Sequence, residues 1–231
     1  MYDIMITKEV VKLYIALIGD IIASKQIVDR DTAQKKLYTL LDKINIKYKE
    51  QLYSPFTITA GDEFQALFIP NTYIFQIIDE ISLAFMPYEI RFGIGAGTML
   101  TKIDRTISIG SDGPAYWQAR KAINFIHSNN DYGMNKIAVS IENKVTEEVI
   151  NTILSACAFI QSKWIKTQQI ILKQLIIENN YSEYFSNKNL AKSLGISPSA
   201  FNKRLKASGI KIYLRNKNIA MNMLLNETRE K

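Results

Sequence analysis

Two aspartates that follow apolar runs are the residues of this chain best placed to do chemistry. Asp20 ends the apolar run Leu13–Gly19, and Asp62 lies in the tight turn between two β-rich runs. Carboxylates at two strand ends can share a divalent cation, and a bound cation can hold phosphates. The pattern therefore predicts a metal site with Asp20 and Asp62 as ligands. For either aspartate taken alone, an ordinary Gly-Asp turn is the alternative.

The supply of other metal-binding side chains limits which metal to expect. The chain has one cysteine, Cys157, and one histidine, His127. These two cannot build a His/Cys zinc cluster, and a single cysteine forms no internal disulfide. Carboxylate ligands instead favour Mg²⁺ or Mn²⁺.

The bulk properties predict a globular protein of the cytoplasm. Of the 231 residues, 47% are hydrophobic. No apolar run approaches the roughly 20 residues that a membrane-spanning helix needs. The first residues lack a basic stretch followed by a long apolar one, so we expect no signal peptide. We expect no membrane span.

The elements that must position the aspartates follow from hydrophobic periodicity. Residues 1–144 predict the order β-α-β-β-α-β-α-β. The predicted ranges are Leu13–Ile22, Asp31–Leu52, Phe56–Thr59, Phe64–Ile69, Thr72–Phe85, Glu89–Gly97, a helix from Asp112-Gly113-Pro114 to about His127, and Lys136–Ile141. This order is the split βαβ pattern of a ferredoxin-like palm with a central antiparallel hairpin. The fold class is therefore α+β.

Residues 145–231 predict a second, all-helical domain with a different charge. Helices are expected over Thr146–Lys163, with Thr146 as the capping residue, and over Thr167–Glu178. Residues 1–150 hold 16 of the 29 Lys and Arg and 18 of the 22 Asp and Glu, which leaves 13 and 4 for residues 151–231. A basic tail on a mildly acidic body favours a polyanionic partner, although a solvated lysine-rich surface explains the charge equally well.

A compact pattern in residues 188–208 resembles the helix-turn-helix family. Leu190, Ala191 and Leu194 share one apolar face. Gly195 suits a left-handed turn, and Ser197-Pro198 suits the start of the next helix. Phe201 and Leu205 then face inward, which leaves four polar side chains outward: Ser199, Asn202, Lys203 and Lys206.

Outward side chains of this kind can contact bases and phosphates in a major groove of DNA. DNA is therefore the predicted partner of the second domain. The alternative is an ordinary helical hairpin that packs on the body of the protein.

Four segments of the first domain together resemble the class III nucleotidyl cyclases. They are Ile15–Ile22, Thr59–Phe64, Ile90–Gly97 and Gly110–Arg120. The tetrad Gly61-Asp62-Glu63-Phe64 also resembles the GGDEF diguanylate cyclases. Over residues 13–210, the chain is most similar to the SatD family, a cyclase-like palm followed by a helix-turn-helix.

The cyclase resemblance implies roles for individual residues. Asp20 and Asp62 match the two metal aspartates, and Arg120 matches the catalytic arginine that stabilises charge at the reacting phosphate. The remaining positions implied to bind a nucleotide are Ile21, Ile22, Ser24, Gly61 and Glu63. Class III cyclases build their site between two palms, so the resemblance also implies a homodimer.

The chain departs from the cyclase pattern where the base and ribose are read. Tyr116 stands where the catalytic asparagine is expected, and Ile58 replaces the base-selecting lysine. These departures favour a DNA-binding regulator whose degenerate cyclase-like domain binds a nucleotide with Mg²⁺. An active nucleotidyl cyclase or nucleotidyltransferase that uses Asp20, Asp62 and Arg120 is the alternative, and a silent dimerising scaffold is a third.

Several residues near these motifs have structural explanations. Gly93, Gly95 and Gly97 more readily allow close packing than form a phosphate loop, because no helix follows them directly. Arg120 is either a site residue or the partner of Asp112 or Glu63. His127 lacks a carboxylate partner nearby in the sequence, so we expect it to be structural.

Overall fold

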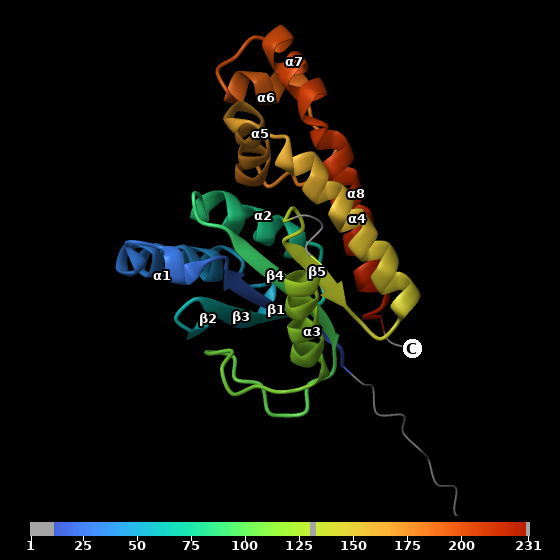
Figure 1. Ribbon diagram of the computed structural model, residues 1–231. Coiled ribbons are helices and arrows are strands. Elements are labelled where there is room, and N and C mark those ends of the chain that lie inside the picture. The colour runs from blue at the N-terminus through green and yellow to red at the C-terminus, as the bar shows by residue number, and fades with distance from the viewer. Residues whose placement is uncertain (1–11, 130–132, 230–231) are drawn as a thin grey trace, which may run out of the picture.

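The computed structural model describes residues 12–129 and 133–229 as a mixed α+β protein. Its described part contains a five-stranded sheet and eight α-helices. Figure 1 shows the sheet and its covering helices below and a group of helices above. A long pair of helices runs from this group back down along the sheet.

The sheet places the first strand in its centre. The strands are β1 (Tyr14–Ile21), β2 (Leu52–Ala60), β3 (Glu63–Phe68), β4 (Ile90–Gly97) and β5 (Ile137–Ser140). Their order is β2-β3-β1-β4-β5, and only the β4–β5 pair is parallel. Because β3 lies between β1 and β2, the split βαβ arrangement predicted from the element order is present.

Helices cover both faces of the sheet. On one face, α1 (Arg30–Lys47) and α2 (Ile74–Phe85) pack on the side chains of Ile15, Leu17 and Ile21 of β1. On the other face, α3 (Pro114–Ser128) packs on the alternate residues Tyr14, Ala16 and Ile18. The alternation of β1 between two apolar cores explains its nearly continuous hydrophobic run.

The glycines of β4 allow α3 to lie directly against the strand. A Cβ atom on Gly93 would lie 2.4 Å from the backbone oxygen of Ala119, and one on Gly95 would lie 2.2 Å from its nitrogen. The close-packing interpretation of these glycines is therefore confirmed, and α3 is brought near the residues at the strand ends.

The second half of the chain is helical, as predicted. Its helices are α4 (Lys144–Ser162), α5 (Lys166–Ile177), α6 (Asn187–Ser193), α7 (Pro198–Ser208) and α8 (Ile210–Asn226). Helix α8 runs back along α4, and its Ala220, Met221 and Leu224 join the same core as α1 and α2. The two predicted regions are thus joined by apolar packing.

The structure corrects three local predictions. The β2–β3 hairpin lies at one edge of the sheet and not in its centre. An edge position suits Pro55, because proline cannot donate a ladder hydrogen bond. Helix α1 ends at Lys47, so the segment before Phe56 already belongs to strand β2. Asn143, and not Thr146, caps α4, since its side chain accepts a hydrogen bond from the Thr146 N–H.

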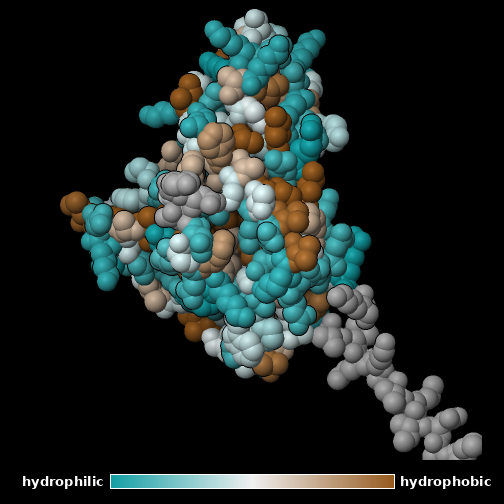
Figure 2. Space-filling model, turned by 45° about the vertical axis from the view of Figure 1, so that its right-hand side comes forward, coloured by the Kyte–Doolittle hydropathy of each residue, from teal (hydrophilic) through white to brown (hydrophobic). Residues whose placement is uncertain are grey.

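The surface is largely hydrophilic, with scattered apolar side chains. An apolar strip in Figure 2 lies where α4 comes into view, and the exposed residues of that helix include Val145, Val149 and Phe159. Among the described residues, we find no helix with the length and apolar character needed to cross a membrane.

Candidate functional site

Strand pairing brings three charged residues to one end of the sheet. In the antiparallel register, Asp20 of β1 lies opposite Glu63 of β3 on one side and Arg91 of β4 on the other. Directly opposed residues present their side chains on the same face. That face is the one covered by α3, so the end of β1 forms a charged cluster beside the helix.

Asp20 is half-buried and has two basic neighbours, Arg91 and His127. Its Oδ2 accepts a hydrogen bond from the Arg91 guanidinium at 3.0 Å, and the imidazole Nε2 of His127 lies 3.7 Å from the same oxygen. Burial raises the pKa of Asp20 above its ordinary value, Arg91 opposes that shift, and the charge of Asp62 adds to it. The two predicted metal aspartates are therefore close enough to interact electrostatically.

Asp62 lies at the tip of the β2–β3 hairpin. Its Oδ2 accepts a hydrogen bond from the Ser24 hydroxyl at 2.5 Å, and its backbone oxygen accepts one from the Ile21 N–H at 3.0 Å. Gly61 supplies the left-handed backbone of the turn, with φ of +62°, and its carbonyl accepts from Gln34 of α1. These contacts fix the hairpin tip against the end of β1.

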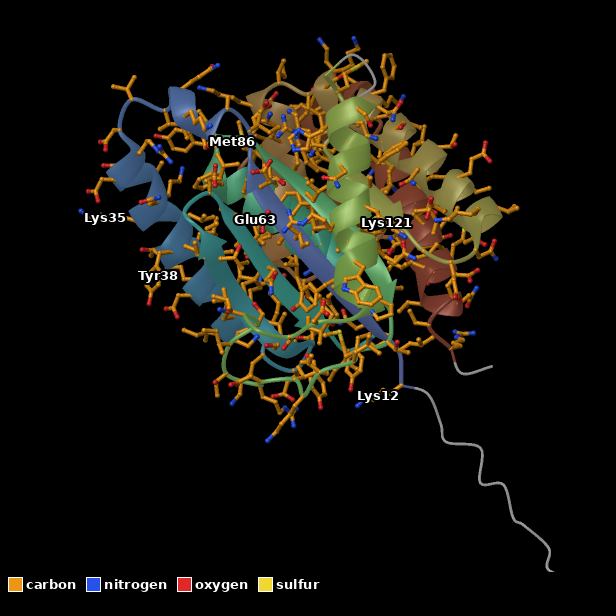
Figure 3. The ribbon with its side chains drawn as sticks, turned by 60° about the horizontal axis from the view of Figure 1, so that its bottom comes forward. Lys12, Lys35, Tyr38, Glu63, Met86 and Lys121 are labelled. Atoms are coloured by element: carbon orange, nitrogen blue, oxygen red, sulfur yellow. The ribbon has the colours of Figure 1, made fainter. Side chains whose placement is uncertain are left out.

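Arg120 pairs with Glu63, which was one of the two partners considered from the sequence. The guanidinium of Arg120 donates to both carboxylate oxygens of Glu63, at 2.5 and 2.7 Å. The Glu63 carboxylate raises the pKa of Arg120, and Asp20 contributes in the same direction. Figure 3 shows Glu63 over the sheet beside α3, the helix that carries Lys121 and Arg120.

Asp20 and Asp62 are the two carboxylates at the hairpin tip that could hold a hard divalent cation. The hydrogen bonds that Asp20 and Asp62 accept use Oδ2, so Oδ1 of each has no hydrogen-bond partner among the described residues. A cation between them would relieve the repulsion that helps to raise the pKa of Asp20. Across the described ranges, no group of three or more His, Cys, Asp or Glu side chains is arranged to hold a metal. Water or ligand oxygens would therefore complete the shell.

The space around the hairpin tip is divided into two parts. A cavity of about 10 Å³, room for one water molecule, is lined by Ile21, Ser24, Gly61 and Asp62 together with α1 residues. A wide groove of about 380 Å³ lies alongside, between α1 and β2, and is lined by Gln34, Lys35, Tyr38, Ile58 and Gly61, among others. Figure 3 shows Lys35 and Tyr38 on the α1 side of this groove.

Two other predicted nucleotide-binding residues, Ile22 and Glu63, make hydrogen bonds within the chain. The backbone N–H of Ile22 donates to the carbonyl of Glu89, so it is not free to face a phosphate. Glu63 is occupied by Arg120. Both groups therefore have partners within the chain, and their part in nucleotide binding stays a prediction.

The structure also brings in residues that sequence analysis missed. His127 has a carboxylate partner after all, Asp20, which lies 107 positions earlier in the chain. Arg91 and Gln34 likewise meet the site only through tertiary packing. The strand register was the signal that could have identified Arg91, since its position on β4 faces Asp20 of β1.

The helices α6 and α7 have the local geometry expected from residues 188–208. Gly195 has φ of +64°, and Ser197 caps α7 by accepting a hydrogen bond from the Ala200 N–H at 3.2 Å. Phe201 is fully buried and Leu205 packs against the same core. The four outward residues are all exposed: Ser199, Asn202, Lys203 and Lys206.

Comparisons with known proteins identify the family but no function. Two structures of bacterial light-regulated adenylyl cyclases are similar at 14% and 15% identity, with TM-scores of 0.39 and 0.38. The matches cover 57% and 58% of this chain, and 76% and 44% of theirs. Similarity this low carries no weight for function, and no curated protein matches the sequence. The SatD family model matches residues 14–224, and the chain therefore belongs to the SatD family.

Proposed function

We propose that this protein is a DNA-binding regulator whose palm binds a nucleotide together with Mg²⁺ or Mn²⁺. The observation that carries the proposal is the exposed polar face of α7, presented by a capped helix behind a glycine turn. The interacting carboxylates of Asp20 and Asp62 support the nucleotide half of the proposal.

The α7 face has the chemistry that DNA recognition needs. Lys203 and Lys206 supply cations for phosphates, and Ser199 and Asn202 supply hydrogen-bonding groups for base edges. The Asn202 side chain accepts a hydrogen bond from Asn187 at 3.1 Å, which holds it in place on the helix. The helix lies at the far end of the molecule from the sheet, so the palm does not block its approach to DNA (Figure 1).

Fluorescence anisotropy with labelled fragments of genomic DNA tests this half of the proposal. Lys203→Ala combined with Lys206→Ala should weaken binding by about tenfold or more at low salt and reduce the salt dependence, because two phosphate contacts are lost. Lys43→Ala, an exposed charge on α1, is the matched control and should change binding little. Equal binding by all three proteins would contradict the assignment of α7.

The groove beside the hairpin is the space we propose for the nucleotide. Tyr38 is 70% exposed and offers an aromatic face for a base, and Lys35 lines the same groove in an ion pair with Asp31. Gly61 lies at the meeting point of the groove and the small cavity under Asp62. A nucleotide base in the groove would therefore place its phosphates toward Asp62.

Asp20 and Asp62 would hold the metal, whose charge would offset that of the nucleotide phosphates. Electron paramagnetic resonance of Mn²⁺ tests this without any activity. Wild-type protein should bind Mn²⁺ more tightly in the presence of nucleotide, and Asp62→Asn should abolish that gain. Asp104→Asn, which changes an exposed loop carboxylate, is the control. If Asp62→Asn bound Mn²⁺ and nucleotide as wild type does, the metal assignment would be wrong.

Nucleotidyl cyclase or nucleotidyltransferase activity is the second candidate. It is favoured by the position of Arg120, whose charge interacts with Asp20 at the proposed metal site. In a homodimer, the carboxylates of one palm would meet Arg120 of the other. Incubation with each NTP and Mn²⁺, followed by mass spectrometry, should reveal product that disappears with Asp62→Ala. Monomeric behaviour in sedimentation at high concentration would rule out the shared site.

A further inference from the structure

A second cavity lies between the palm and the helical region, and it shares no lining residue with the cavity and groove at the hairpin tip. Its volume is about 340 Å³, within the range of small-molecule sites. Its walls come from α2 and the start of β4 on the palm side, and from α4, α5 and α8 on the helical side. Its polar and aromatic lining residues include Asp79, Gln161, Trp164, Gln169, Tyr213 and Lys217.

Lys217 is a buried cation that donates no hydrogen bond to any described residue. Its side chain is 1% exposed, and its Nζ lies 3.6 Å from Oδ1 of Asp79, beyond hydrogen-bond distance. It lies over the rings of Phe75 and Tyr213, at 4.9 and 5.3 Å from their centroids. An ammonium group carries three donors. Burying a charged ammonium group without a hydrogen-bond acceptor is costly, so Lys217 needs an acceptor.

Asp79 does not fill that need because it is already occupied. It accepts hydrogen bonds from Tyr181 at 2.5 Å and from Tyr213 at 2.7 and 2.8 Å. The ion pair between Asp79 and Lys217 leaves no net charge here, and Glu89 and Lys136 pair with each other at another part of the wall. A bound anion would therefore lie near the Asp79 carboxylate with no unpaired cation to neutralise its charge. A neutral acceptor oxygen brings no charge and avoids that repulsion.

We propose that this cavity binds a small, neutral, aromatic or heteroaromatic amide. Its carbonyl oxygen accepts from Nζ of Lys217, and its ring lies against the aromatic wall formed by Trp164 and Tyr213. The side-chain amides of Gln161 and Gln169 also line the cavity and make no hydrogen bond to other described residues. They supply both donors and acceptors for the N–H groups and remaining oxygens of the ligand. Since both halves of the chain form the walls, occupancy would link the palm to the helices that carry α7.

Fluorescence of Trp164 in the full chain tests the proposal. The chain has two tryptophans, and Trp117→Phe leaves Trp164 in the cavity wall as the sole reporter. The probes are uracil, hypoxanthine and nicotinamide, with orotate and nicotinate as charged counterparts of the first and third. At least one neutral probe should change the emission saturably, and its charged counterpart should bind about tenfold more weakly or worse.

Variants then test the contact to Lys217. Lys217→Met should weaken the responding probe by at least about tenfold, the effect of losing a hydrogen bond to a charged group. If the unpaired Asp79 prevents that variant from folding, as judged by circular dichroism, the double change Lys217→Met with Asp79→Asn replaces it, and Gln161→Ala gives a second readout with a smaller loss. The proposal is wrong if no probe changes Trp164 emission, if neutral and charged probes bind alike, or if the folded variants bind as their parent does.

Discussion

Arg120 of α3 donates to both carboxylate oxygens of Glu63, at 2.5 and 2.7 Å, across 57 positions of sequence. This pair joins the helix on one face of the sheet to the tip of the hairpin that carries Asp62. The Thr59 hydroxyl also donates to Glu63, at 3.1 Å. The proposed site is therefore held by side chains from the hairpin, the sheet and the helix together.

Glu63→Gln should lower the free energy of unfolding by about 0.5–1 kcal/mol, because a two-point but partly exposed ion pair is lost. Urea denaturation measures the change. Asp31→Asn removes the exposed pair between Asp31 and Lys35 within α1 and should cost less. An equal or larger loss with Asp31→Asn would mean that the Glu63–Arg120 pair contributes no more to the free energy of unfolding than an exposed ion pair does.

Gly95→Ala should destabilise the protein by about 3 kcal/mol or prevent folding, because the new Cβ would meet the rigid backbone of α3. Gly195→Ala tests backbone strain alone, since its Cβ would meet nothing within 4 Å while its φ is +64°. It should cost about 1–2 kcal/mol. Thermal unfolding of both variants gives the comparison, and a Gly95→Ala variant as stable as wild type would contradict the close packing of β4 and α3.

Tyr181→Phe should lower the free energy of unfolding by about 1–3 kcal/mol, because its hydroxyl donates at 2.5 Å to the buried carboxylate of Asp79. This bond links α2 of the palm to the loop before α6. Tyr184→Phe is the control, since Tyr184 is 81% exposed, and it should be nearly neutral. Chemical denaturation measures the stability of the two variants. An equal loss of stability in both would contradict the role of Tyr181.

Cys157 should resist thiol reagents in the native protein, since burial raises the pKa of its thiol to about 11. Because the unfolded thiol ionises near 9 and the native thiol does not, this residue should lower stability as the pH rises above about 9. Alkylation at pH 8 should become fast only in denaturant. Cys157→Ala should show a smaller decline of stability between pH 8 and pH 10, and a native thiol that reacts at the denatured rate would refute the prediction.

Local periodicity was enough to predict the order of strands and helices over residues 1–144, because each of these elements has one or two apolar faces of regular spacing. The close packing at Gly95 and the capping roles of Ser197 and Pro198 followed from residue type alone. These features depend on neighbours in sequence or on one backbone contact.

The charge partners of the site could not be predicted in the same way. Asp20 meets Arg91 and His127 through sheet register and the placement of α3, which involve separations of 71 and 107 residues. The return of α8 into the palm core was also missed, since its apolar residues fit a helix of either region. Tertiary packing decided these contacts, and the local pattern did not contain them.

A gel mobility shift with genomic DNA fragments, run at low salt with and without each nucleotide and Mg²⁺, tests the central claim most directly. We predict that the wild-type protein binds DNA and that at least one nucleotide changes its affinity. We also predict that Asp62→Asn removes the nucleotide effect but retains DNA binding. The absence of any binding to DNA at low salt would contradict the account.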